Sequence, residues 1–186
     1  CGRYYVVGAP NADERRGMVR VMNLTPSGAR LAANATLRAS DASAADQFGS
    51  SVACDGERII VGAPIRGAVG GAYIYRLTGD NTWEEEAIVA PALSESGAMA
   101  GLSVAIQGGL AVLGAPEEES ATGAAYLFSL EAEGWVEQTR LRAARTRRGD
   151  RLGSAVAIGG PRVLVGARNA DLEGMGNRGE AFVFRQ

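Results

Sequence analysis

The composition of this chain is most informative in what it lacks. Its 186 residues contain no histidine, and all 19 basic residues are arginine, so lysine is absent as well. Without histidine the chain lacks both the commonest general base and the commonest zinc ligand of proteins. Without lysine it can form no Schiff base and carries no P-loop lysine. Several common kinds of catalytic site are therefore excluded.

Net charge, cysteine and long apolar runs are also scarce. The formal net charge is -2, which gives no overall attraction to nucleic acid or to acidic membranes. No run of about 18 apolar residues occurs, so we expect no membrane span. Cys1 and Cys54 are the only cysteines, and two cysteines define neither a disulfide framework nor a redox compartment. The sequence thus predicts no nucleic-acid partner and no transmembrane segment.

Glycine, by contrast, is abundant and regularly spaced. The glycine of the string "VGAP" recurs at intervals of 54, 52 and 52 residues, at Gly8, Gly62, Gly114 and Gly166. A second series has a period of 52 residues and consists of Gly49, Gly101 and Gly153. A period near 50 residues is typical of a propeller or another repeat array.

Each repeat is predicted to hold four antiparallel strands. In the second repeat they cover residues 48–54, 58–63, 71–77 and 82–90, which are enriched in strand-forming residues. The segment 58–63 shows no polar alternation, as expected of a strand covered on both faces. Asp55 and Gly56 form a favoured two-residue turn between the first two strands. Pro64 ends the second strand, because proline cannot donate to the sheet.

The repeat residues resemble a known family. The strings "FGSSVA", "VGAP" and "GAYIY", with Trp83 or Trp135 opening the fourth strand, resemble the FG-GAP repeat of integrin-α-type β-propellers, especially its bacterial-style variant. Ala100 and Leu152 stand where the second repeat has Phe48. The resemblance implies an all-β fold, a β-propeller segment of four-stranded antiparallel blades. It comprises about three and a half blades of a ring that commonly has seven.

The resemblance also implies a division of the chain. We expect one FG-GAP β-propeller fragment over 1–186, with partial blade 1 at 1–47, blade 2 at 48–99, blade 3 at 100–151 and partial blade 4 at 152–186. Such an array leaves blade faces and sheet edges open. We therefore expect the remaining blades of a longer chain as partners. Closure by a second copy is less favoured, because the first blade lacks its first strand and the last blade its fourth.

Three functions remain open at this stage. The resemblance implies a non-catalytic binding or adhesion module of a secreted or cell-surface protein, with a protein or glycan ligand and no cofactor. The alternative is a structural scaffold propeller of a larger multidomain enzyme or receptor. The third is a glycan hydrolase or lectin with a site at the propeller mouth, which would need a facing pair of carboxylates. We predict the first function and expect no enzymatic activity.

The candidate partner-binding residues follow from topology. In an antiparallel blade, the loops after the second and the fourth strands emerge on the same face. In blade 3 these loops carry the acidic run "EEES" and the arginine-rich segment "RLRAARTRRGDR". The predicted partner-binding residues are Glu117, Glu118, Glu119, Arg145, Arg147 and Arg148. The alternative is a solvated connection whose charges pair with one another. The tripeptide "RGD" at 148–150 also resembles an integrin-recognised sequence, on three letters only.

Metal-ligand patterns are weak. Calcium is not inferred from the resemblance, because a two-residue turn after the first strand cannot wrap six or more oxygens around an ion. The string "NADLEG" resembles the start of a calcium loop, with candidate ligands Asn169, Asp171 and Glu173. An ordinary loop is favoured there, and no metal site is predicted. Asp46 and Asp150, which precede first strands, are interpreted as turn caps.

The two cysteines are interpreted separately. Cys1 occupies the repeat position of Asp55, which favours truncation within a repeat over a lipidated N-terminus. Cys54 occupies the position of Ile106 and Ile158, which indicates a buried small apolar residue.

Overall fold

Strands account for most of the described chain. The computed structural model describes residues 2–24, 31–79, 81–171, 176 and 178–185. The first sheet contains β1 (Tyr4–Ala9), β2 (Met18–Leu24) and β3 (Leu31–Leu37). The second contains β4 (Ser51–Asp55), β5 (Arg58–Ala63), β6 (Gly71–Gly79) and β7 (Thr82–Val89). The third contains β8 (Ser103–Gln107), β9 (Leu110–Ala115), β10 (Ala124–Glu131) and β11 (Gly134–Leu141). The fourth contains β12 (Leu152–Gly159), β13 (Arg162–Ala167) and β14 (Glu180–Arg185).

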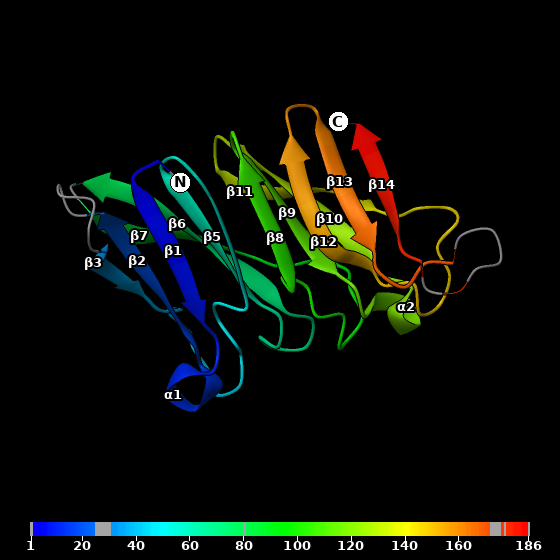
Figure 1. Cartoon of the computed structure of the whole chain (residues 1–186), viewed down its shortest axis with the longest axis horizontal. Helices are drawn as coiled ribbons and strands as arrows, with labels where there is room; N and C mark the ends of the chain where they lie inside the picture. The colour runs from blue at the N-terminus through cyan, green and yellow to red at the C-terminus, as the bar shows by residue number, and fades with distance from the viewer. Residues whose placement is uncertain (1, 25–30, 80, 172–175, 177, 186) are drawn as a thin grey trace.

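The four sheets are antiparallel, and the strands of each sheet follow chain order. They lie side by side, from β1–β3 at one end of Figure 1 to β12–β14 at the other. Two short helical turns, α1 (Ala12–Arg15) and α2 (Glu118–Ala121), lie in loops between the strands. The predicted fold is thus confirmed as a β-propeller segment of four-stranded antiparallel blades. We refer to the sheets as blades 1 to 4.

The turn between the first two strands of blade 2 lies one residue later than predicted. Asp55 pairs with Arg58, so the turn residues are Gly56 and Glu57 rather than Asp55 and Gly56. Gly56 has a φ of 56°, whereas Glu57 does not have a positive φ. A positive φ at the first central residue alone is typical of a type II′ turn. The predicted pair of turn residues, Asp55 and Gly56, was therefore wrong by one position, although Gly56 does lie in the turn with a positive φ.

The last strand of each complete blade carries a β-bulge. Ile74 pairs with Ala87 and Tyr75 pairs with Glu85, which leaves Glu86 as the extra residue of β7. The register of β11 shifts at the corresponding place. A bulge increases the local twist and redirects side chains. The side chain of Glu86 is therefore available to neighbouring residues rather than following the strand's alternation.

The strand β5 is covered on both faces, as its unbroken apolar run predicts. Ile59 and Val61 pack towards blade 1 in a cluster that includes Val19. Ile60 belongs to another cluster, with Leu113 of blade 3. All five side chains are fully buried, and each such burial contributes roughly 1.5–3 kcal/mol. Apolar packing between blades, rather than within a separate core, therefore stabilises the array.

Backbone meets backbone where one blade joins the next. A Cβ atom placed on Gly62 of β5 would lie 2.0 Å from the carbonyl oxygen of Gly101, which precedes β8. Since real Cβ atoms do not approach an atom this closely, only glycine fits. The same distance of 2.0 Å applies at two further contacts, Gly8 to Gly49 and Gly114 to Gly153. We call these three contacts the glycine seams.

Hydrogen bonds from serine side chains reinforce two of the three glycine seams. The hydroxyl of Ser51 donates to the carbonyl of Gly101 at 2.7 Å, and Ser103 donates to Gly153 at 2.8 Å. Beside the seams, the blades are joined by three backbone N–H···O bonds of 2.9–3.1 Å, Phe48 to Arg16, Ala100 to Val69 and Leu152 to Thr122. The regular glycine spacing in the sequence therefore records the contact between blades as well as the turns.

We predict that Gly114→Ala lowers the free energy of unfolding by about 1–3 kcal/mol, because its methyl group would overlap a backbone carbonyl. Gly159→Ala is the matched control, since no atom lies within 4 Å of a Cβ placed there. Urea denaturation of both variants measures the difference. Equal stability of the two variants would contradict the close approach at Gly114.

Candidate ligand-binding face

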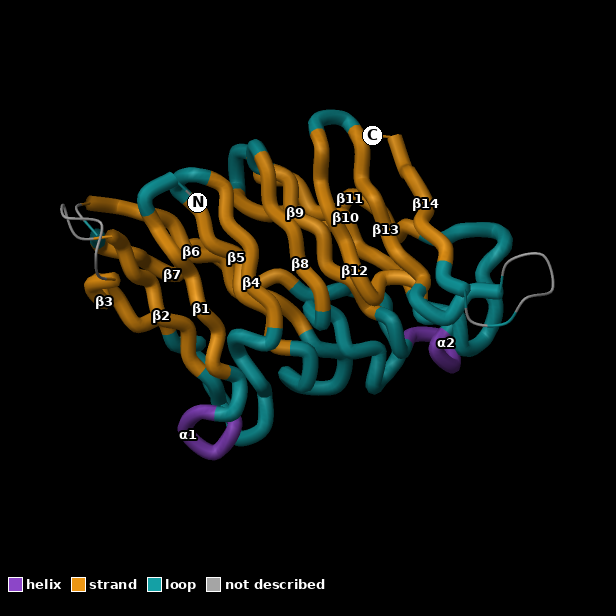
Figure 2. Tube along the Cα trace, in the orientation of Figure 1, coloured by secondary structure: helices purple, strands orange, loops and turns teal. Residues whose placement is uncertain are grey.

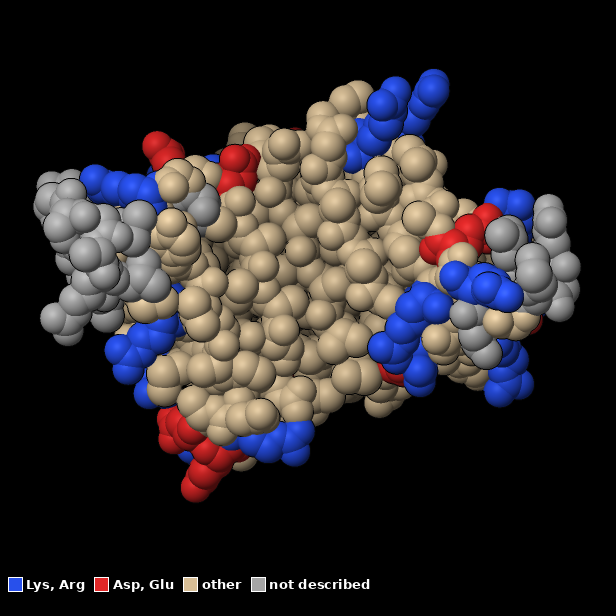
Figure 3. Space-filling view, in the orientation of Figure 1, with Lys and Arg blue, Asp and Glu red and all other residues tan. Residues whose placement is uncertain are grey.

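The loops after the second and fourth strands lie on one edge of the array, as topology predicts. Figure 2 shows this edge with α1 and α2, opposite the short hairpin turns and the two chain ends. We call this edge the loop face. The surface towards the viewer in Figure 3 is largely uncharged at its centre, and charged side chains gather around its margin. The charged side chains seen in this view therefore lie at the margin, to which the loop face belongs.

The acidic run before and within α2 is largely occupied by internal contacts. Glu118 is 1% exposed, and its carboxylate accepts hydrogen bonds of 2.7 Å from the hydroxyl of Tyr126. The same carboxylate forms an ion pair with Arg140. Glu119 also pairs with Arg140, at 3.1 Å, and Glu117 pairs with Arg151 at 2.9 Å. The pairing of this run with the arginine-rich segment is thus observed.

The predicted arginines of the connection from β11 to β12 differ in their contacts. Arg145 forms an ion pair with Glu180 of β14. Arg147 and Arg148 are exposed, and neither forms an ion pair with any residue in the described parts of the chain. The structure therefore places all six predicted residues on the loop face, and four of them form an ion pair with another described residue. Their partner-binding role stays a prediction.

The loop that carries Arg147 and Arg148 is fixed by hydrogen bonds. The carboxylate of Asp150 accepts a bond of 2.7 Å from the backbone N–H of Arg147. The N–H groups of Gly149 and Arg151 both donate to the carbonyl of Ala121, at 3.0 Å and 2.9 Å. Asp150 is buried at 8% exposure, so the "RGD" tripeptide does not present its carboxylate. The interpretation of Asp150 as a turn cap is confirmed.

Two of the hollows that the described residues form on the loop face lie beside the charged loops. One, of about 390 Å³, lies beside the arginine-rich loop and is lined by Glu119, Thr122, Gly123, Arg142, Ala143, Ala144 and Thr146. The other, of about 430 Å³, lies near the connection from β3 to β4 and is lined by Asp41, Ser43, Asp46, Ile65, Arg66 and Gly67. Asp46 accepts the N–H of Ser43 at 2.8 Å, which confirms that it too caps a turn.

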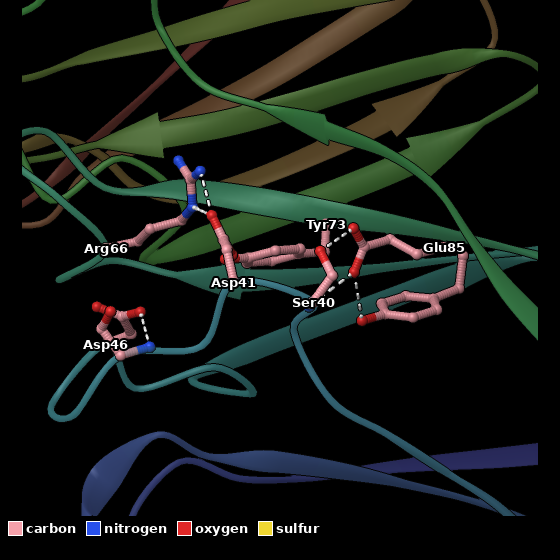
Figure 4. Close-up of polar contacts among 8 residues, drawn as sticks. Ser40, Asp41, Asp46, Arg66, Tyr73 and Glu85 are labelled. Carbon is pink, nitrogen blue, oxygen red and sulfur yellow. Dashed lines mark hydrogen bonds and ion pairs between the residues drawn. The ribbon is translucent and has the colours of Figure 1, made fainter.

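A polar cluster beside the second hollow was not predicted from the sequence. Figure 4 shows Asp41 between Arg66 and Tyr73. Arg66 donates to Asp41 at 2.6 Å, and the hydroxyl of Tyr73 donates to the other carboxylate oxygen. Asp41 follows blade 1, whereas Arg66 and Tyr73 belong to blade 2, so the cluster joins the two blades. Tyr126 is the repeat counterpart of Tyr73, and this shared tyrosine was the only available signal.

The pKa shifts of these clusters describe fixed hydrogen-bond networks. The hydrogen bond from Arg66 lowers the pKa of Asp41 below its ordinary value of 3.8. Burial, with a further contribution from Asp41, raises the pKa of Tyr73. Burial and the bond to Glu118 raise the pKa of Tyr126. The carboxylate thus stays charged and the tyrosines stay neutral at physiological pH, which keeps the hydroxyls as hydrogen-bond donors.

An ion pair within blade 2 also accepts a hydrogen bond from blade 3. The carboxylate of Glu86 accepts hydrogen bonds from Arg58, at 2.8 Å and 3.0 Å, and from the indole of Trp135 at 3.2 Å. The bond from Arg58 is the main cause of a lowered pKa of Glu86. The bulge in β7 therefore supplies an acceptor for the tryptophan that opens β11.

The structure also tests the predictions for metal ligands, for the cysteines and for a membrane span. Within the described residues, no group of three or more histidine, cysteine, aspartate or glutamate residues could hold a metal ion. Of the "NADLEG" candidates, Glu173 lies outside the described residues, as does Cys1. Cys54 is disulfide-bonded and only partly buried, so its interpretation as a buried apolar residue was wrong. No helix in the described part of the chain is long and apolar enough to span a membrane.

We predict that the stabilising effect of Asp41 depends on pH. Because folding lowers the pKa of Asp41, its charge stabilises the fold above about pH 4 and this contribution is lost as the pH falls through the lowered value. Asp41→Asn lacks the contribution at every pH, so the stability difference between the wild type and Asp41→Asn should shrink on acidification. Urea denaturation at several pH values measures it. Tyr73→Phe keeps the ion pair with Arg66, which is the larger cause of the lowered pKa, and should retain most of the wild-type pH dependence.

A difference between wild type and Asp41→Asn that stays constant down to about pH 2 would contradict the ion pair with Arg66.

The comparisons with known proteins agree with the repeat architecture. A search of curated proteins found no match. A family model described as FG-GAP repeat matches residues 32–75 and 135–184. Each match begins in the last strand of one blade and ends in the third strand of the next, so it spans the place where two blades join. The two matches together cover half of the chain, and the protein therefore belongs to the FG-GAP repeat family.

Proposed function

We propose that this chain is a non-catalytic binding module of a secreted or cell-surface protein, and that its ligand is an acidic protein or glycan. One observation carries the proposal. Arg147 and Arg148 are exposed on a fixed loop of the loop face and form no ion pair with a described residue, whereas the four other arginines of that segment each form one. Two neighbouring guanidinium groups that pair with no carboxylate in the described part of the chain offer a site for an anionic group of a ligand.

The geometry of the loop favours binding. An arginine side chain can donate two parallel hydrogen bonds to a carboxylate or sulfate group. The backbone bonds of Asp150 and Ala121 hold the loop in place, which reduces the entropy lost when a ligand orders it. The hollow of about 390 Å³ includes Thr146, the chain neighbour of Arg147. It offers room for the neutral part of a ligand beside its charged group.

A structural scaffold is the second candidate function. It is favoured by the many charges of the loop face that are already paired internally, such as those of Glu117, Glu119 and Arg142. A scaffold needs no free charge on this face. The two candidates therefore differ in what the unpaired Arg147 and Arg148 contribute.

Cys54 supports a location outside the cytosol. It is disulfide-bonded, and the sequence contains one other cysteine, Cys1. Disulfides form and persist in oxidising compartments and are rare in the cytosol.

We predict that Arg147→Ala combined with Arg148→Ala weakens binding to a sulfated or carboxylated polymer by about fivefold, since exposed ion pairs contribute up to about 1 kcal/mol each. Heparin and polyglutamate columns eluted with a salt gradient provide the two probes, and earlier elution is the expected result. They separate a glycan ligand from an acidic protein ligand. Arg162→Ala combined with Arg185→Ala is the matched control, because both arginines are exposed at strand ends away from the loop face.

Equal elution of the two double variants on both columns would contradict the binding role of Arg147 and Arg148 and would favour the scaffold.

We also predict that no thiol reacts before reduction. A maleimide applied to the denatured, unreduced protein from an oxidising host should leave Cys54 unmodified, because its sulfur is engaged in a disulfide. After reduction the same reagent should modify it. Mass spectrometry of the peptide that contains Cys54 measures the outcome, and labelling before reduction would contradict the disulfide.

A further inference from the structure

The most exposed large apolar side chain in the described part of the chain lies on the loop face. Leu93, in the connection from β7 to β8, is 86% exposed, whereas the other exposed side chains of this kind range from 38% to 58%. A single exposed leucine is common on protein surfaces. Its place in the repeat and its neighbours, however, set this one apart.

Leu93 occupies a repeat position at which the other connections hold a charged residue that faces the next blade. Counting 52 residues in either direction from Leu93 gives Asp41 and Arg145. Asp41 accepts a hydrogen bond from Tyr73, on the third strand of blade 2. Arg145 forms an ion pair with Glu180, on the third strand of blade 4. At both positions the side chain therefore ties the connection to the blade that follows it.

Blade 3 does not use the side chain at this position. The hydroxyl of Tyr126, the repeat counterpart of Tyr73, donates to Glu118 within blade 3 at 2.7 Å. The connection contributes only the backbone carbonyl of Leu93, which accepts a longer bond of 3.4 Å from the same hydroxyl. The side chain of Leu93 is therefore not needed to join blades 2 and 3, and it is left in solvent.

Leu93 also shares a continuous surface with the loop of Arg147 and Arg148. It lines a hollow of about 270 Å³ together with Ser94, Glu95, Glu118, Glu119 and Arg140. Glu119 also lines the hollow of about 390 Å³ that includes Thr146, the residue before Arg147. The two hollows therefore adjoin at Glu119, with Leu93 at one end of the surface and the arginines at the other.

The charge of this surface changes sign along its length. Glu95 is exposed beside Leu93 and forms no ion pair with a described residue. Arg147 and Arg148 are exposed at the other end. A sulfated or carboxylated glycan carries negative charge along its whole length, so Glu95 would repel it. A protein segment can instead place an acidic group at one end of the surface and an apolar side chain at the other.

We propose that the loop face binds a protein segment that seats a large apolar side chain against Leu93 and pairs an acidic group with Arg147 and Arg148. This inference rests on the proposed binding function and names a protein, rather than a glycan, as its ligand. The apolar contact adds affinity and specificity, because it removes the surface of an exposed leucine from water. Exposed ion pairs alone contribute little.

Two synthetic polypeptides test the apolar contact. One is polyglutamate, and the other is a copolymer of glutamate and tyrosine with the same number of carboxylates. Each is immobilised, beside heparin as a third surface, and the affinity of the folded chain is measured by biolayer interferometry at one ionic strength. We expect the wild type to bind the copolymer about fivefold more tightly than polyglutamate, because Leu93 is partly buried on binding.

Leu93→Ser should remove the preference for the copolymer and leave the affinity for polyglutamate unchanged. Because the side chain is 86% exposed, this variant should unfold at the wild-type urea concentration. Leu93→Met should keep the preference, since methionine presents a similar apolar surface. Val136→Ser is the matched control and should also keep it. Val136 is 44% exposed but lies close to the turn between β10 and β11, at the opposite edge from the loop face.

The experiment separates this inference from the proposed function. If Arg147→Ala combined with Arg148→Ala weakens binding to both polypeptides while Leu93→Ser changes neither affinity, the inference is overturned and the proposed function is kept. If the arginine variant changes neither affinity, both are overturned. Wild-type binding to the copolymer that is absent or no tighter than to polyglutamate would also contradict the inference. Tighter binding to heparin than to the copolymer would contradict it in favour of a glycan.

Discussion

The close approach of two backbones at each glycine seam is the contact on which the array depends. With a Cβ position only 2.0 Å from a carbonyl oxygen, the seam tolerates no side chain, and the chain must place glycine there in every repeat. This approach brings the next blade near enough for the side chains of Ile60 and Leu113 to pack in one buried cluster. The apolar contacts supply the free energy, and the seams set the spacing at which those contacts form.

The same spacing organises the loop face. Because neighbouring blades are held close, a loop that follows one blade reaches side chains of the next, as Asp41 reaches Arg66 and Tyr73. In blade 3 the corresponding hydroxyl, that of Tyr126, donates to Glu118, which pairs with Arg140, and all three residues belong to the same blade. Internal pairing of this kind uses most charges of the face. Arg147 and Arg148 are among the charges of this face that form no ion pair with a described residue, and their role in partner binding stays a prediction.

The glycine period and the apolar run of β5 were sufficient to predict the all-β fold and the covered strands, because both patterns depend directly on repeat length and burial. Antiparallel topology likewise predicted that Glu117 and Arg151 share a face. The exact turn at Gly56, the bulge at Glu86 and the cluster at Asp41 could not be predicted, because each depends on register or on a loop path that periodicity does not encode. The disulfide of Cys54 was not predicted for a related reason, since two cysteines in a sequence reveal a pairing only when their distance in space is known.

The most direct test of the central claim is native-state amide hydrogen exchange at Phe48, Ala100 and Leu152. Their N–H groups donate across the three junctions between blades and report on those junctions alone. If the seams hold the array together, these amides should exchange as slowly as the amides of the central strands β5 and β9, because their exchange then requires global unfolding. Fast exchange at these three amides, with the strands still protected, would show that the blades separate freely and would contradict the account.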